Sequence, residues 1–233
     1  MLSYVYTHSA NVEFLMLRLG RSAIEVLSYL IDRHSDITLF KCIDYPRKKS
    51  FNEWRKEETN RPPEDTTARC RQHDTGDRNW HPLPRTAATP DELLKIADSL
   101  PAGRALAITS KVTLADKRKL HIPLIDFQCN TSTENLQNVK RCMRGMDDAG
   151  GVILKSARSY HYYGMSLLTD DQWLDFVGRC LLREPDINMQ PYVDIRYLGH
   201  RLQEGWGSLR ISRDSLSGKF RNYPKVVDNV QPK

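Results

Sequence analysis

The segment that decides the fold runs from His121 to Cys129 and has the sequence HIPLIDFQC. Its apolar run, Ile122 to Ile125, predicts a buried strand, and Asp126 follows that run directly. A carboxylate at the end of a buried strand needs a metal ion, a basic side chain or backbone donors as a partner. On this segment alone, an aspartate that only caps a turn is the alternative.

The next segment outward, residues 151–168, has the sequence GVILKSARSYHYYGMSLL and predicts a β-hairpin. It concentrates hydrogen-bond donors of the kind that bind phosphate oxygens: Lys155, Arg158, Ser159 and His161. Alternate side chains of a strand point to opposite faces, so Ser159 and His161 share one face and the tyrosines at 160 and 162 share the other. An aromatic-rich exposed hairpin with an incidental histidine is the alternative.

A third segment, residues 190–212, has the sequence QPYVDIRYLGHRLQEGWGSLRIS. It predicts two strands around a loop that contains Gly205 and Gly207. Asp194 ends the first of these strands, and Arg210 lies in the second. Taken alone, this pattern is most often structural.

The flanking sequence supplies helices, one strand near the N-terminus, and a strand at 104–114 that a charged turn, ADKRK, joins to the segment LHIPLIDFQC in a first hairpin. Apolar periodicity and capping residues predict helices at 12–33 (interrupted at Gly20), 89–100, 131–146 and 168–182, and a strand at 35–46. After residue 100 the order is therefore β-β-α-β-β-α-β-β, which favours a mixed α/β (α+β) fold with a mostly antiparallel sheet and helices on one face. We expect an N-terminal helical or α/β subdomain over 1–99 with a long charged loop at about 47–90. A core over 100–215 and a basic, loosely attached tail over 216–233 follow.

Composition limits the class of protein. The chain has 233 residues, of which 39% are hydrophobic, and a net charge of +6. Its mean hydropathy is −0.58 and its pI is about 9.1. No apolar run approaches the ~20 residues that a membrane helix needs, and the N-terminus lacks a secretory pattern, so we expect a cytoplasmic protein. The basic balance favours an anionic partner, and five cysteines without a CxxC pair indicate reduced thiols.

Together, the three segments resemble the motifs of the archaeo-eukaryotic primase superfamily, the primases and primase-polymerases. The first motif, an apolar strand ending in acid-x-acid, is similar to LIDFQ here. The second, a small residue two positions before a histidine, corresponds to Ser159 and His161. The third, an apolar residue and an aspartate with a basic strand downstream, corresponds to Val193, Asp194 and SLRIS. The resemblance covers roughly residues 100–215 and implies a primase-like core with an RNA-recognition-motif-like C-terminal half.

The resemblance also implies a chemistry. Asp126, Asp194 and His161 would be catalytic, and the two aspartates would hold Mg²⁺ or Mn²⁺. The nucleotide phosphates would be bound by Arg158, Ser159, His161 and Arg210. The expected partners are nucleotides (NTP or dNTP), single-stranded or template nucleic acid, and a helicase, an ATPase or other subunits of a replication or defence complex. No membrane is expected.

One position departs from the family pattern. Gln128 occupies the place of the second acid of the first motif, and an amide offers a neutral oxygen in place of a charge. Three hypotheses stay open on the sequence alone. The chain is a primase-like nucleotidyltransferase, a primase-fold module that binds nucleotide or nucleic acid without turnover, or an unrelated α/β scaffold in which Asp126, His161 and Asp194 lie far apart.

Two weaker patterns lie in the N-terminal region. Cys42, Cys70, His73 and His81 have zinc-ligand side chains, but their spacing matches no standard zinc finger, so zinc is not expected. Trp54, within a charged segment, could contact nucleic acid, although a solvated helix with one buried face is the favoured interpretation. The tyrosines at 160, 162 and 163 are expected to pack within the sheet.

Overall fold

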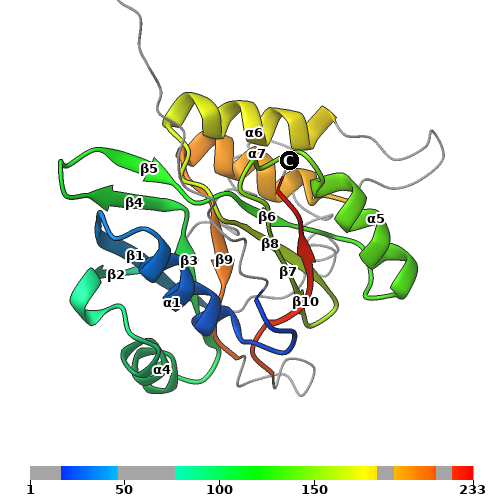
Figure 1. Cartoon of the computed structure of the whole chain (residues 1–233). Helices are drawn as coiled ribbons and strands as arrows, with labels where there is room; N and C mark the ends of the chain where they lie inside the picture. The colour runs from blue at the N-terminus through cyan, green and yellow to red at the C-terminus, as the bar shows by residue number, and fades with distance from the viewer. Residues whose placement is uncertain (1–16, 47–76, 183–191, 214–221, 233) are drawn as a thin grey trace, which may run out of the picture.

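In the part of the chain that the structure describes, the fold consists of two antiparallel β-sheets and five α-helices (Figure 1). The structure is a computed structural model that describes residues 17–46, 77–182, 192–213 and 222–232. The mixed α/β class and the antiparallel strand pairing predicted from the sequence are confirmed.

The larger sheet has the strand order β5-β4-β1-β3-β9, and β2 also pairs with β1. Its strands are β1 (Ile37–Pro46), β2 (Asn79–Pro84), β3 (Arg104–Thr109), β4 (Lys111–Leu114), β5 (Lys119–His121) and β9 (Ser208–Arg210). All of its strand pairs are antiparallel. The strands that precede residue 99 thus share one sheet with strands of the expected core.

The smaller sheet has the order β10-β7-β8-β6. Its strands are β6 (Leu124–Asp126), β7 (Gly151–Ser156), β8 (Ser159–Gly164) and β10 (Lys225–Val230). The tail was expected to be loosely attached, and for residues 225–230 that expectation was wrong, because β10 pairs with β7 along its length. The apolar side chains of Val226 and Val230 are buried, which explains why this basic segment docks.

The helices are α1 (Ala23–Arg33), α4 (Pro90–Ser99), α5 (Thr133–Met143), α6 (Asp170–Leu182) and α7 (Ile195–Glu204), with a 3-10 turn η1 (Arg85–Ala87) before α4. The predicted N-caps of α4 and α6 are confirmed: the hydroxyl of Thr89 accepts from the backbone N–H of Glu92, and that of Thr169 accepts from Gln172. Ser22 forms a complete capping box with Glu25 at the start of α1.

Two elements differ from the sequence prediction. Residues 195–204 were expected to include strand and loop, but they form α7, because the Asp194 carboxylate caps its first turn and Gly205 ends it in the left-handed region at φ 69°. Residues 79–84 were expected to belong to a long loop, but they form β2 along β1. Of the long charged segment, residues 47–76 lie outside the described residues, as does Trp54.

Two apolar cores flank the smaller sheet. One face of this sheet packs against α5, α6 and α7 through residues such as Ile125, Tyr162 and Phe176. The opposite face packs, through Leu124, Leu154 and others, against α1 and the larger sheet. In Figure 1, α6 and α7 lie along one side of the molecule, and α1 and α4 lie on the other.

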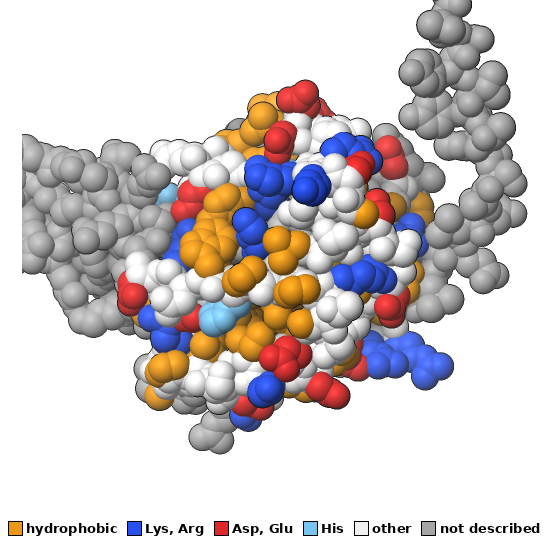
Figure 2. Space-filling model, turned by 90° about the vertical axis from the view of Figure 1, so that its left-hand side faces the viewer, with side chains coloured by type: hydrophobic (Ala, Val, Ile, Leu, Met, Phe, Trp, Pro, Cys, Tyr) orange, Lys and Arg blue, Asp and Glu red, His pale blue; other side chains and the backbone are white. Residues whose placement is uncertain are grey.

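The surface keeps some large apolar groups. Figure 2 shows hydrophobic side chains gathered on one face of the molecule, with lysine and arginine side chains beside them. Within the described ranges, the four cysteines are free, and no helix is long and apolar enough to cross a membrane.

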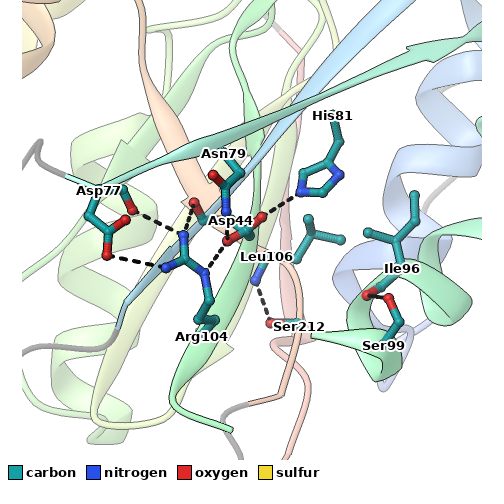
Figure 3. A network of polar contacts seen from close by, with 9 residues as sticks. All are labelled: Asp44, Asp77, Asn79, His81, Ile96, Ser99, Arg104, Leu106 and Ser212. Carbon is teal, nitrogen blue, oxygen red and sulfur yellow. Dashed lines mark hydrogen bonds and ion pairs between the residues drawn. The ribbon is translucent and has the colours of Figure 1, made fainter. Parts of the chain in front are cut away.

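A buried carboxylate joins three neighbouring strands of the larger sheet, β1, β2 and β3 (Figure 3). Asp44 on β1 is 2% exposed and accepts hydrogen bonds from Asn79 (3.2 Å) and from Nε2 of His81 (2.6 Å), both on β2. The guanidinium of Arg104, at the start of β3, donates to the same carboxylate and also to Asp77. Burial alone would raise the pKa of Asp44, but these donors outweigh it and the pKa is lowered. Asp44 therefore links β2 and β3 to β1.

Candidate functional site

A pocket of about 470 Å³ lies where the two sheets meet α7. The smaller sheet and its connections contribute Asp126, Phe127, Gln128, Ser156, Arg158, Ser159 and His161 to the lining. The larger sheet and α7 contribute Ile43, Tyr45, Arg78, Tyr197, Arg201, Ser208, Leu209 and Arg210. Six of the eight residues considered from the sequence, Gln128 included, thus line one pocket, and the exceptions are Asp194 and the exposed Lys155.

Strand alternation explains how a buried sheet produces a polar pocket. Leu124 packs into the core toward α1, and Asp126, two residues further along β6, points to the same face but lines the pocket. On β8 the same relation holds between Tyr163, which is in the core, and His161, which lines the pocket. One face of the smaller sheet therefore changes from apolar to polar along its strands. The tyrosines at 160 and 162 pack on the opposite face, as predicted.

Asp126 and His161 form a cross-strand pair. They are direct register partners between β6 and β8, and Nε2 of His161 lies 3.6 Å from Oδ1 of Asp126. The Asp126 side chain keeps 34% of its surface exposed. Burial of the carboxylate, followed by the nearby charge of Asp194, raises the pKa of Asp126 to about 8, although Arg210 and Arg201 act in the opposite direction. The pocket therefore holds an acid whose negative charge is not fully compensated.

His161 is almost completely buried, with 6% of its surface exposed. Within the described residues, its Nδ1 atom has no hydrogen-bond partner. Burial, and then the positive charge of Arg210, lowers the pKa of His161 well below its ordinary value, so the ring is neutral at physiological pH. A neutral imidazole can donate one hydrogen bond and accept another.

Asp194 lies beside the pocket and not in its lining. An isolated bridge pairs Phe127 with Val193, and the backbone N–H of Asp194 donates to the carbonyl of Asp126 at 3.0 Å. The Asp194 carboxylate accepts from the backbone N–H of Tyr197 at 2.9 Å as the N-cap of α7. The sequence interpretation put Asp194 at the end of a strand in the same cleft as Asp126, whereas in the structure it follows a single bridge residue, caps α7 and lies outside the pocket lining.

Cationic side chains also line the pocket. Arg210 on β9 is 5% exposed; its Nη2 atom donates to Oγ of Ser156 at 2.9 Å, and its Nη1 atom donates to the carbonyl of Ser212. Arg158 lies at the exposed turn between β7 and β8. Ser159 donates its hydroxyl hydrogen to the carbonyl of Phe127, which fixes the start of β8 against the end of β6.

Sequence reasoning missed the part of the site that α7 and the start of β2 supply. Arg201 is 5% exposed and donates to Ser208 at 3.1 Å, while both Arg201 and Arg78 form ion pairs with Glu204 (3.2 and 2.7 Å). The spacing of Ile195, Leu198 and Leu202 was a helical signal that the sequence offered here. No comparable signal marked Arg78, because a short strand brings it to the pocket from a region of low apolar content.

No group of three or more His, Cys, Asp or Glu side chains is arranged to hold a metal ion within the ranges that the structure describes. For the zinc pattern, Cys70 and His73 lie outside the described residues. Of its other members, Cys42 is buried, and Nε2 of His81 is engaged with Asp44.

Comparison with known proteins gives the class. The family model described as archaeo-eukaryotic primase 1D-like matches residues 86–224. The chain therefore belongs to the archaeo-eukaryotic primase-like family. No curated protein and no solved structure matched the chain.

The family match removes the third hypothesis, that of an unrelated scaffold. The matched range includes both strands that carry Asp126 and His161, as well as α7 and β9. It begins after β2, so that strand and Arg78, which directly precedes it, are outside the matched range.

Proposed function

We propose that the chain is a primase-like nucleotidyltransferase that adds nucleotides to a growing strand on a nucleic-acid template, with Mg²⁺ or Mn²⁺ as its cofactor. The observation that carries the proposal is the pairing of Asp126 and His161 in a pocket that is also lined by the guanidinium groups of four arginines. A carboxylate, a neutral imidazole and guanidinium groups are the parts that a metal-bound triphosphate requires.

The acidic side of the pocket fits a divalent cation. The raised pKa of Asp126, caused first by burial and then by the Asp194 carboxylate, marks a place where added positive charge is favourable. Asp126 and Asp194 would hold the ion, and Gln128 would offer a neutral oxygen. A bound Mg²⁺ or Mn²⁺ would neutralise triphosphate charge and lower the pKa of an attacking 3′-hydroxyl.

The basic side of the pocket fits the triphosphate. Arg210 is held by Ser156 and the Ser212 carbonyl, so its guanidinium is oriented before any ligand binds. His161 can donate a ring N–H to a phosphate oxygen, and the exposed Arg158 and the Ser159 hydroxyl lie at the same end of the hairpin. These residues would bind and orient the nucleotide.

A second candidate function rests on Gln128. This residue lines the pocket where the family pattern has an acid, so the site has one negative charge fewer. A primase-fold module that binds nucleotide or nucleic acid for a larger complex, without turnover, is therefore the alternative.

A primer-extension assay separates the two functions. Labelled NTP or dNTP is supplied with a single-stranded template and Mn²⁺ or Mg²⁺, and products are compared for wild type, Asp126→Ala and Gln128→Glu. For an enzyme, the Asp126 variant should lose at least about 100-fold in rate, because a metal ligand supplies several kcal/mol of charge stabilisation. Asp175→Asn, at a surface pair with Arg179 on α6, is the control and should match wild type.

The possible results are distinct. Products that persist at the wild-type rate in Asp126→Ala would contradict the proposed metal site. Products that are absent from wild type and appear with Gln128→Glu would favour the binding module, with the amide as the change that ended turnover.

A further inference from the structure

An exposed aromatic ring lies beside the pocket, on the strand that the family model does not match. Trp80 on β2 is 51% exposed and is the register partner of Ile43, which lines the pocket. A tryptophan with half of its surface open to water carries a hydrophobic cost that packing does not relieve.

A second tryptophan and one lysine contact this ring, and two arginines contact the second tryptophan. The Trp80 and Trp206 ring centroids are 5.2 Å apart, with the planes inclined by 59°. Nζ of Lys41 lies over Trp80 at 5.9 Å from the ring centroid, and the guanidiniums of Arg78 and Arg201 each lie 5.2 Å from the centroid of Trp206. These five residues, called the tryptophan platform below, are held in place by cation–π and aromatic contacts.

The tryptophan platform is continuous with the pocket. Arg78 and Arg201 belong to both, since they line the pocket and also contact Trp206. Glu204 pairs with both arginines and so keeps their guanidiniums in position between the pocket and the rings. A chain-like ligand with one unit in the pocket can therefore place a neighbouring unit on Trp80.

We propose that the tryptophan platform binds single-stranded nucleic acid by stacking an unpaired base on Trp80, with Lys41 close to the adjacent phosphate. This inference rests on the proposed function, because it assigns the place where the template strand leaves the nucleotide pocket. Charge complementarity selects this occupant. An open aromatic face bordered by cations suits a base and its phosphate, whereas an acidic or purely apolar peptide would use only one of the two features.

Binding of a fluorescently labelled oligo-dT of about 15 nucleotides, a length that spans one such site, tests the inference. Wild type is compared with Trp80→Ala, Trp80→Phe and Leu174→Ala. The last removes a side chain of similar exposure (47%) from α6 and is the matched control. We expect Trp80→Ala to weaken oligonucleotide binding about tenfold, as loss of one stacked base does. Trp80→Phe should retain most of the affinity, and the control should retain all of it.

Further arms identify what is bound. Oligo-U in place of oligo-dT distinguishes RNA from DNA, and heparin supplies charge without bases. Heparin affinity should not change in Trp80→Ala. Binding of a nucleoside triphosphate with Mn²⁺ should also be unchanged in Trp80→Ala and lost in His161→Ala. The two measurements therefore test the tryptophan platform and the nucleotide pocket independently.

Three results would overturn the inference. They are equal oligonucleotide affinity of wild type and Trp80→Ala, an equal loss for oligonucleotide and heparin, and no oligonucleotide binding by wild type at low salt. Because Trp80 is exposed, its replacement should leave the melting temperature close to that of wild type, which a thermal scan checks.

Discussion

Each sheet of the described structure has a cross-strand aspartate–histidine pair, and the surroundings of the two pairs are opposite. In the larger sheet, Asp44 is 3% exposed at its side chain and 2.6 Å from His81, and Arg104 and Asn79 also donate to it (Figure 3). In the smaller sheet, Asp126 is 34% exposed and 3.6 Å from His161. The same two side chains therefore form a cluster in the larger sheet whose carboxylate is fully hydrogen-bonded, and a pair in the smaller sheet whose carboxylate is not.

The pKa shifts express the same difference. The donors around Asp44 outweigh its burial and lower its pKa, whereas burial and Asp194 raise the pKa of Asp126 to about 8. A carboxylate whose oxygens already accept hydrogen bonds from protein donors has no free oxygen to bind a ligand. A carboxylate whose charge is not compensated, in a pocket, is the kind of group that functional sites contain. The contrast shows why only the second pair is proposed as functional.

The largest expected effect on stability comes from removing Arg104, one of the donors to the Asp44 carboxylate. Arg104→Met should lower the free energy of unfolding by about 3 kcal/mol, because removing one partner leaves a buried charge uncompensated. Urea denaturation measures the change. The double variant Asp44→Asn with Arg104→Met should recover part of the loss, and an effect of Arg104→Met below about 0.5 kcal/mol would show that Asp44 needs no compensation.

The two histidines sharpen the comparison. His81→Leu should cost about 1.5 kcal/mol, since Asp44 loses a hydrogen bond to a charged group. His161→Leu should cost less, because it removes a buried Nδ1 atom that has no partner among the described residues. Denaturation of both variants under the same conditions gives the difference, and equal losses would contradict the assignment of opposite environments. Nucleotide binding should be lost only in His161→Leu.

Asp126→Asn should have the smallest effect on stability, and with the opposite sign. The folded-state pKa of Asp126, about 8, lies above its ordinary value of 3.8, so the folded protein binds the proton more tightly than the unfolded chain. Wild type therefore loses stability as pH rises from the lower of these pKa values to the higher. Asparagine does not ionise, so Asp126→Asn does not lose stability in this way. It should be more stable than wild type by about 1 kcal/mol near pH 8, after allowance for solvent screening at a partly exposed group.

The pH dependence provides the check. The stability advantage of Asp126→Asn should shrink as pH falls and should vanish below about pH 3, where the wild-type carboxyl is protonated in both the folded and the unfolded state. Thermal scans at several pH values measure it. An advantage that does not change with pH would mean that the titration of Asp126 is not its cause.

Local pattern predicted the parts of the molecule that depend on local physics. Strand alternation placed Ser159 and His161 on one face, and capping residues located the starts of α4 and α6. The apolar run that ends at Asp126 marked β6. These features depend on residues a few positions apart, which a single sequence displays directly.

Features that depend on distant pairing were missed. The strand β2 is rich in proline and tryptophan and carries little alternation, so its pairing with β1 could not be inferred. For α7, the aromatic and branched residues favoured a strand, but the Asp194 carboxylate caps the first turn and stabilises a helix. The full surroundings of Asp44 and Asp126 involve residues more than 30 positions away, and no local pattern distinguishes them.

The measurement that tests the central claim most directly is metal-dependent nucleotide binding by calorimetry. Wild type, Asp126→Asn and Asp44→Asn are titrated with a nucleoside triphosphate in the presence and absence of Mn²⁺. We predict that wild type binds with Mn²⁺, that Asp126→Asn binds at least about tenfold more weakly, and that Asp44→Asn, if folded, binds like wild type. Equal binding by wild type and Asp126→Asn, or a loss confined to Asp44→Asn, would contradict the account.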